Sequence, residues 1–139
     1  MELHQCINFL LSTAQNTVFQ YFNQKLSQYN ITPAQYGVLN CLWEHGELTP
    51  KQIGEFLVLE ASSISGILER MQKNNLIERN IHPNNRRTIV VTTTEQADDI
   101  RHNIEEIVSE MNHKFLSFLS EDERHLFTQI LQKIIHIPK

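Results

Sequence analysis

Small and hydroxyl-bearing side chains crowd one short stretch of this 139-residue chain. Residues 61–66 read Ala-Ser-Ser-Ile-Ser-Gly, whereas an ordinary surface helix would carry Lys and Glu there. Side chains of this size let a helix lie close against another surface while their hydroxyls donate and accept hydrogen bonds. Serines near a helix start also act as caps. The stretch therefore fits either a contact surface or an ordinary capped helix end.

Two adjacent arginines, Arg86 and Arg87, follow the turn-forming run His-Pro-Asn-Asn at residues 82–85. Residues 88–93 read Thr-Ile-Val-Val-Thr-Thr and are β-branched throughout, which favours a strand. With the strand-like residues 76–79 before the turn, they predict a β-hairpin that has the arginine pair at its tip. Arginines in a turn are commonly just solvated, but a guanidinium also fits the minor groove of DNA.

Two short helices joined by a tight turn would position the serine-rich stretch. The first opens at Thr49, a good N-cap, with Pro50 at the first helical position and Gln52 placed to close a capping box. Its buried face is expected to hold Ile53, Phe56 and Leu57. The second begins near Ala61, after a turn at residues 58–60. Its apolar residues repeat with a helical period: Ile64, Ile67, Leu68 and Met71.

A helix–turn–helix followed by a basic hairpin indicates a winged helix, whose second helix enters the major groove and whose hairpin, the wing, reaches the minor groove. Residues 50–90 carry six basic and four acidic side chains, whereas the whole chain has a net charge of −4. A slightly basic reading surface on an acidic body limits non-specific DNA affinity. The candidate DNA-contacting residues are Thr49, Ala61, Ser62, Ser63, Ser65, Arg70, Asn85, Arg86 and Arg87.

The stretch from about Ile31 to Ala97 resembles the MarR family of bacterial winged-helix regulators, and compatible helices lie on both sides of it. The resemblance rests on the Thr-Pro-x-Gln-Tyr helix start at Thr32, on ILERMQKNNLIER (residues 67–79) and on NNRRTIVVTTTEQA (residues 84–97). Asn85 stands where the family usually has an acid in the wing, and Asn75 where it usually has Gly. The resemblance implies a homodimeric transcription regulator, a repressor released by a small-molecule effector.

The predicted fold is mainly α with a small β-wing, formed by one MarR-like chain, 1–139. Residues 32–94 are the expected DNA-binding lobe, with a third short strand at residues 47–48. Residues 1–29 are expected to form one helix broken at Asn30. They and residues 95–139, where helices open at Thr94 and Ser120, are the expected dimerisation helices. A two-fold dimer would present its recognition helices about 34–36 Å apart, which predicts a pseudo-palindromic double-stranded DNA operator.

Other classes of function find no support in the sequence. No nucleophile–base pattern, phosphate loop or paired catalytic carboxylate stands out, so neither enzyme activity nor a cofactor is expected. The seven histidines are scattered, with no i, i+4 partner among His and Cys, so no metal site is expected. No apolar run resembles a signal peptide or approaches membrane-spanning length, which predicts a cytoplasmic protein without membrane contact.

Two alternatives remain open at this stage. Some relatives sense oxidants through a cysteine in the first helix, which makes Cys6 a candidate redox thiol. However, Cys6 lies about two residues earlier than expected, and that shift turns a side chain by about 200° on a helix. Cys41 is expected to be an inert core thiol. The second alternative is a winged-helix module for protein–protein contact, which the basic wing and the small-residue helix start disfavour.

Overall fold

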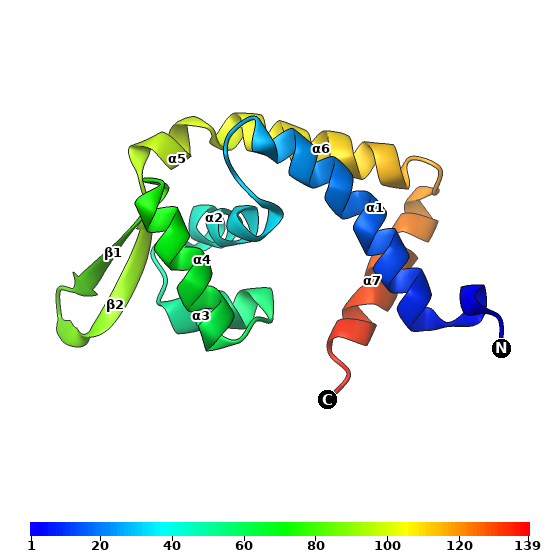
Figure 1. Ribbon diagram of the computed structural model, residues 1–139, viewed down its shortest axis with the longest axis horizontal. Coiled ribbons are helices and arrows are strands. Elements are labelled where there is room, and N and C mark those ends of the chain that lie inside the picture. Colours follow the sequence, from blue (N-terminus) through cyan, green and yellow to red (C-terminus); the bar gives the residue numbers. More distant parts are fainter.

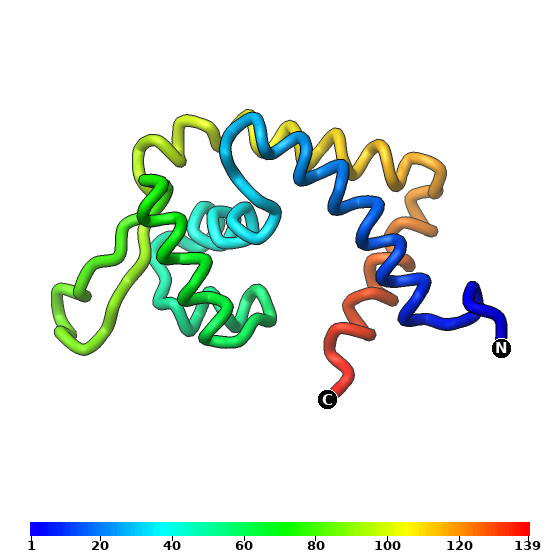
Figure 2. Tube along the Cα trace, in the orientation of Figure 1, coloured from blue at the N-terminus to red at the C-terminus, as the bar shows by residue number.

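The computed structural model describes all residues, 1–139, as a mainly helical chain with one two-stranded antiparallel sheet (Figure 1). A lobe holds α2 (Pro33–His45), α3 (Pro50–Leu57), α4 (Ala61–Lys73), β1 (Ile77–His82) and β2 (Asn85–Thr93). An arm holds α1 (Ile7–Ser27), α6 (Arg101–Leu116) and α7 (Glu121–Ile135), and α5 (Glu95–Asp99) links the two. The Cα trace shows α1 and α6 side by side along the arm, with the N-terminus at its far end, while α7 turns back below the arm and brings the C-terminus toward the lobe (Figure 2). This architecture confirms the predicted fold class.

Capping boxes fix the starts of α2 and α3 where the sequence predicts them. Thr32 Oγ1 accepts the Gln35 N–H at 3.2 Å, while Gln35 Oε1 accepts the Thr32 N–H at 3.2 Å. Thr49 and Gln52 repeat the arrangement at 3.2 and 2.9 Å. A proline follows each threonine at a position where no backbone donor is needed. The two helices therefore begin at defined residues without help from distant packing.

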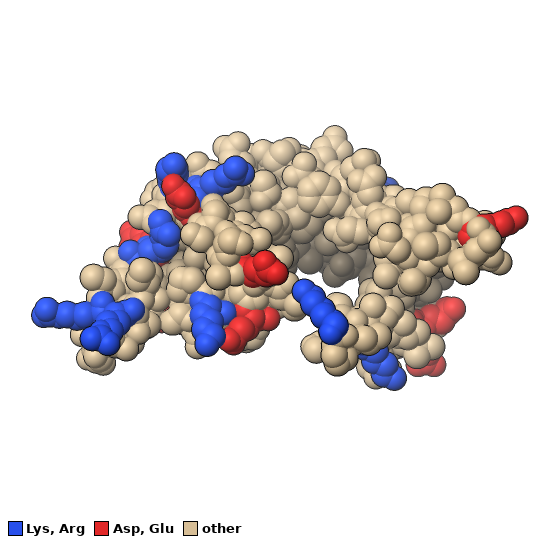
Figure 3. All heavy atoms as spheres, turned by 60° about the horizontal axis from the view of Figure 1, so that its bottom comes forward, with Lys and Arg blue, Asp and Glu red and all other residues tan.

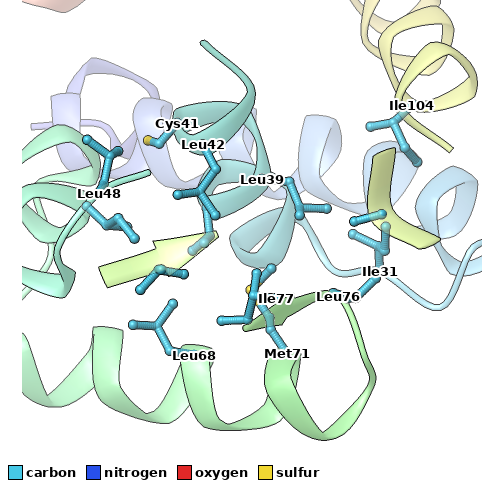
Figure 4. Close-up of a cluster of buried hydrophobic side chains, with 14 of the residues drawn as sticks. Ile31, Leu39, Cys41, Leu42, Leu48, Leu68, Met71, Leu76, Ile77 and Ile104 are labelled. Carbon is cyan, nitrogen blue, oxygen red and sulfur yellow. The ribbon is translucent and has the colours of Figure 1, made fainter. Parts of the chain in front are cut away.

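The apolar core lies in the lobe between α2, α3, α4 and the sheet, and it reaches α6 through Ile104. Figure 4 shows side chains from these elements converging on one another, among them Leu39, Leu42, Leu68 and Ile77. The predicted stripe of α4 is buried at three positions and half-buried at the fourth: Ile64, Leu68 and Met71, then Ile67. Each fully buried Leu or Ile contributes about 1.5–3 kcal/mol by leaving water.

One residue of the predicted core lies outside it. Phe56 is 52% exposed and stacks on His45, with ring centroids 4.4 Å apart. The cause is Gly54, where an added Cβ would lie 3.1 Å from the Leu59 carbonyl oxygen. Because of this close approach, the buried face of α3 lies at Ile53 and Gly54. On a helix, residue 56 points about 160° away from residue 54, so the Phe56 side chain points toward solvent.

The wing pairs Ile77 with Thr93 and continues in register to Ile81 and Ile89, with an irregularity between Ile81 and His82. Leu48 forms a single antiparallel bridge with Val91. The third strand expected at residues 47–48 is therefore reduced to one bridging residue. Asn75 ends α4 in the left-handed conformation at φ 59°, and Asn30 does the same after α1 at φ 57°. Both breaks agree with the sequence, because Asn tolerates this region better than most residues.

Two helices expected to be continuous are interrupted. A 3-10 turn at Leu3–Gln5 precedes an extended Cys6, so the helix of the arm begins only at Ile7. Leu3 is exposed, so burial of its side chain does not offset the conformational entropy that the first residues would lose in an α-helix. The helix that Thr94 opens is broken at Ile100, between α5 and α6.

The break at Ile100 falls where the lobe meets the arm. On one side Asp98 accepts a hydrogen bond from Trp43 Nε1 at 3.0 Å. On the other side Arg101 pairs with Glu105 at 2.8 Å and with Glu44 at 3.8 Å. The contacts with Trp43 and Glu44 tie both helical segments to the end of α2 at the point where the arm leaves the lobe.

The last helix, α7, buries none of its residues within the chain, although Ser120 and Glu123 form a complete capping box at its start. Its exposed apolar residues are Leu126, Phe127, Ile130, Ile134 and Ile135. No helix in the protein combines the length and the apolar character that crossing a membrane requires.

Candidate nucleic-acid interface

The outward face of α4 is built from side chains that leave it nearly flat. At about 100° per residue, Ser62 and Gly66 lie opposite the stripe that Ile64 and Leu68 bury. Nothing lies within 4 Å of a Cβ added at Gly66. A glycine inside a helix costs about 1 kcal/mol relative to alanine, and no packing within the chain requires this one. Gly66 belongs to the small-residue stretch found in the sequence, and its open surroundings place it beside the candidate contact residues, among which it was not predicted.

The three serines of α4 do not cap the helix. Its N-cap is Glu60, whose side chain accepts no hydrogen bond from the first turn, and the hydroxyls of Ser62, Ser63 and Ser65 bond to nothing in the protein. Five other exposed hydroxyls on helices donate to a carbonyl of the preceding turn, those of Ser12, Thr13, Thr17, Ser27 and Thr128, whereas the hydroxyl of Ser109 on α6 makes no such bond. Helix capping therefore does not account for these serines.

The start of α4 also leaves backbone donors open. The first turn of any helix has N–H groups without an intrahelical partner. In α2 and α3 the capping threonines satisfy one of them, whereas in α4 none is satisfied by a side chain. An exposed helix start with free N–H groups attracts anions, because the helix dipole places partial positive charge there.

Seven of the nine candidate residues line three hollows, and two of these hollows border α4. Ser65 and Ala61 line a groove of about 920 Å³ between α3, α4, the wing strands and the C-terminal Lys139. Thr49 and Asn85 share a hollow of about 330 Å³ between the start of α3 and the wing. Ser62, Ser63 and Arg70 line a third hollow, also about 330 Å³, against the start of α2. These residue types stand out in the sequence, but only the fold shows which of them share a surface.

The wing carries its two arginines exposed on β2, beside the turn. Asn85 Oδ1 accepts the backbone N–H of Arg87 at 3.1 Å, so it shapes the backbone where the family usually has an acid. Neither Arg86 nor Arg87 has a carboxylate within 4.0 Å. In Figure 3 most of the visible Lys and Arg side chains lie over the lobe. Both guanidinium groups are therefore free to meet an external anion.

The two thiols differ in their surroundings. Cys41 is buried in the core, and burial raises the pKa of its thiol, which keeps it protonated and unreactive. Cys6 is half-exposed at the break before α1, where the sequence analysis expected a helical residue. No group of three His, Cys, Asp or Glu side chains has an arrangement that could hold a metal ion.

A helix–turn–helix with an exposed recognition helix and a two-stranded wing defines the class of winged-helix proteins. The MarR family model matches residues 31–89. The chain is 29% identical to the transcriptional regulator MgrA of Staphylococcus aureus over 135 residues, which cover 96% of this chain and 90% of MgrA.

Solved structures show the same architecture. A MarR variant from E. coli in complex with operator DNA has a TM-score of 0.84 at 22% identity, and the match covers 92% of both chains. The PcaV regulator of Streptomyces coelicolor, in complex with its natural ligand, has a TM-score of 0.90 at 23% identity and covers 97% of this chain and 95% of its own. The chain is similar to MarR-type transcriptional regulators over most of its length.

Proposed function

We propose that this protein is a homodimeric, sequence-specific repressor that places α4 in the major groove and the wing in the minor groove. The observation that carries the proposal is the start of α4, where free backbone donors and unpaired serine hydroxyls surround a flat face at Gly66. Its proposed contacts are the nine residues named from the sequence: Thr49, Ala61, Ser62, Ser63, Ser65, Arg70, Asn85, Arg86 and Arg87. A related MarR protein binds operator DNA, which supports the proposal.

The experiment is a binding measurement with the DNA upstream of the protein's own gene and with a random duplex, each at two salt concentrations. We expect tighter binding to the upstream DNA, and a steep fall in affinity with salt for both duplexes because phosphate contacts release counterions. Equal, weak binding to both would contradict sequence-specific recognition. No binding at all would favour the alternative of a protein–protein interaction module.

The arm supports the proposed dimer. The apolar residues of α7 are exposed in the single chain, and Leu3, Ile7, Leu10 and Leu11 near the N-terminus are exposed as well. A second subunit would bury both sets and set the two recognition helices one DNA turn apart. The proposed operator is therefore a pseudo-palindrome with half-sites about 34–36 Å apart.

Release by an effector is part of the proposal. PcaV binds a natural ligand on the same fold. A ligand between lobe and arm would bind one spacing of the recognition helices more tightly than another. That difference in ligand affinity is what would shift the protein to the spacing that does not fit DNA. The site of action would be the cytoplasm, where bacterial DNA lies.

Replacing Arg86 by alanine should weaken operator binding by about 1–3 kcal/mol and make the dependence on salt less steep by about one unit. The guanidinium has no partner in the protein, so its removal should leave the free energy of unfolding unchanged. Fluorescence anisotropy at several salt concentrations measures both quantities. Lys133→Ala, which removes a positive charge from the arm, is the matched control. Unchanged operator affinity in Arg86→Ala would show that the wing does not touch DNA.

Cys6→Ser should bind operator as the wild type does, and mild peroxide should change wild-type affinity little. Cys6 lies before the start of α1, and Cys41 is buried, so no second exposed thiol can resolve an oxidised Cys6 within the chain. The measurement is operator affinity before and after peroxide for both proteins. A loss of tenfold or more in the wild type that is absent from Cys6→Ser would establish the redox alternative.

A further inference from the structure

A hollow separates the start of α2 from the flank of α4 that carries Ser63, Ile67 and Arg70. Its volume is about 330 Å³, and we call it the α2–α4 hollow. Its lining consists of Thr32, Ala34, Gln35, Ser62, Ser63, Gly66, Ile67 and Arg70. No carboxylate is among these eight residues, although the chain as a whole is acidic. Besides Ala34, Gly66 and Ile67, the hollow is therefore lined by side chains that can donate hydrogen bonds, one of which carries a positive charge.

The start of α2 supplies one free backbone donor to this hollow. Pro33 has no N–H, the Gln35 N–H donates to Thr32 Oγ1 at 3.2 Å, and the Tyr36 N–H donates to the Thr32 carbonyl at 2.9 Å. The N–H of Ala34 has no partner in the protein, and Ala34 is exposed. A single orphan donor at the positive end of the helix thus faces the hollow.

Gln35 supplies a second donor, and its orientation is fixed. The residue is only 7% exposed. Its Oε1 must face the Thr32 N–H, because only the oxygen of the amide can accept that hydrogen bond. Its Nε2 has no partner in the protein, yet no buried side-chain atom is left unsatisfied, so this nitrogen keeps access to solvent, and Gln35 lines the hollow. A buried amide held with its donor end toward an opening is poised for an external acceptor.

The facing side of the hollow belongs to α4. Arg70 is exposed and has no carboxylate within 4.0 Å, and the hydroxyls of Ser62 and Ser63 bond to nothing in the protein. Backbone N–H, amide, hydroxyl and guanidinium donors therefore converge from two helices on one small space. An oxyanion such as a phosphate is the ligand class that this set of donors matches.

We infer that the α2–α4 hollow binds a backbone phosphate of DNA and that Gln35 is a positioning residue for the recognition helix. The inference rests on the proposed function. The major groove is about 12 Å wide, so a helix inside it has a sugar–phosphate strand along each flank. One flank of α4 meets the wing, and the other meets the α2–α4 hollow. A phosphate held there fixes the depth and register of α4 without reading sequence.

Gln35→Glu is the sharpest test. Glutamate completes the same capping box, as Glu123 does with Ser120 in this chain, so the fold should be retained. The change replaces the free donor by a negatively charged acceptor that repels phosphate. We expect operator and random-duplex affinities to fall by the same factor, about tenfold or more, because phosphate contacts carry no sequence information. Gln129→Glu, on the polar side of α7, is the control for net charge.

Thermal unfolding of Gln35→Glu verifies that the variant is folded. If Gln35→Glu is unfolded, Arg70→Ala provides the test, because this exposed side chain has no partner in the protein and its removal should not disturb the fold. Arg70→Ala should weaken binding to both duplexes by the same factor and make the dependence of affinity on salt less steep by about one unit. If the wild type discriminates operator from random DNA and both variants bind as tightly as Gln129→Glu, the inference is wrong and the proposed function stands. If the wild type binds no DNA, both fail.

A free anion is the other source of the same chemistry. Inorganic phosphate added to the protein without DNA should raise its Tm no more than chloride at matched ionic strength. The reason is that the hollow is proposed to bind a phosphate only when the duplex holds that phosphate in position. A saturable rise in the wild type that is absent from Gln35→Glu, with equal DNA affinity in both proteins, would assign the hollow to a free anion and overturn the DNA contact.

Discussion

Replacing Gly66 by leucine is expected to abolish operator-specific binding while it stabilises the fold. Gly66 lies at the centre of the outward face of α4, with open space where a side chain would begin. A leucine there would meet the floor of the major groove and hold the helix away, leaving weak, salt-sensitive binding to any duplex. The same change removes a glycine from a helix interior, which should raise the free energy of unfolding by about 0.5–1 kcal/mol. Operator affinity and thermal unfolding, measured on the same preparation, test both effects.

Gly66→Ala is the matched variant, because alanine gives the same gain in helix stability with a side chain of one carbon. It should keep operator binding within a few-fold of the wild type. Lost binding combined with a gain in stability cannot be explained by unfolding. A Gly66→Leu protein that still prefers its operator would place the reading surface on another face of α4.

Deleting residues 121–139 should abolish the dimer and reduce operator affinity by at least about 100-fold, because linked half-sites gain that much from simultaneous binding. Within one chain none of the residues of α7 is buried, so a monomeric protein would tolerate the deletion. In the proposed dimer the deletion exposes apolar surface of the other subunit, and we expect aggregation or partial unfolding. Sedimentation and thermal unfolding of the truncated chain distinguish these outcomes.

A single substitution in α7 tests the dimer contact without removing residues 121–139. Ile130→Asp puts a charge into the exposed apolar stripe of α7, whereas Gln129→Asp puts the same charge one residue away on the polar face. Only Ile130→Asp should dissociate the dimer. A soluble, well-folded monomer in the wild type, unaffected by either variant, would rule out an interface through α7.

The parts of the fold that local chemistry decides could be predicted from the sequence. Thr32 and Thr49 each precede a proline and a capping glutamine, and the starts of α2 and α3 follow from that pattern. Phe56 could not be placed, because its exposure depends on how closely the Leu59 carbonyl and the Ile64 side chain approach Gly54. The break at Ile100 depends on partners from a distant segment, among them Trp43. Neither the packing at Gly54 nor the contacts at Ile100 can be predicted from the spacing of apolar residues along the sequence.

The candidate interface divides in the same way. The serines of α4 and the arginines of the wing are unusual residue types for their positions, and composition alone singles them out. Gln35 is ordinary in sequence, because a glutamine after Thr-Pro-x is explained by capping. Its second role became visible only when the fold showed that one end of its amide is occupied and the other is free.

The unburied helix α7 has a further consequence, which concerns how much of the protein a cell makes. With α7 paired between two copies, as proposed, the amount of folded dimer follows mass action. At low abundance, halving the number of chains would reduce the dimer about fourfold, and each tenfold dilution would cost the assembly about 1.4 kcal/mol. The rate of synthesis of this chain would then be a second input to its target genes, independent of any effector.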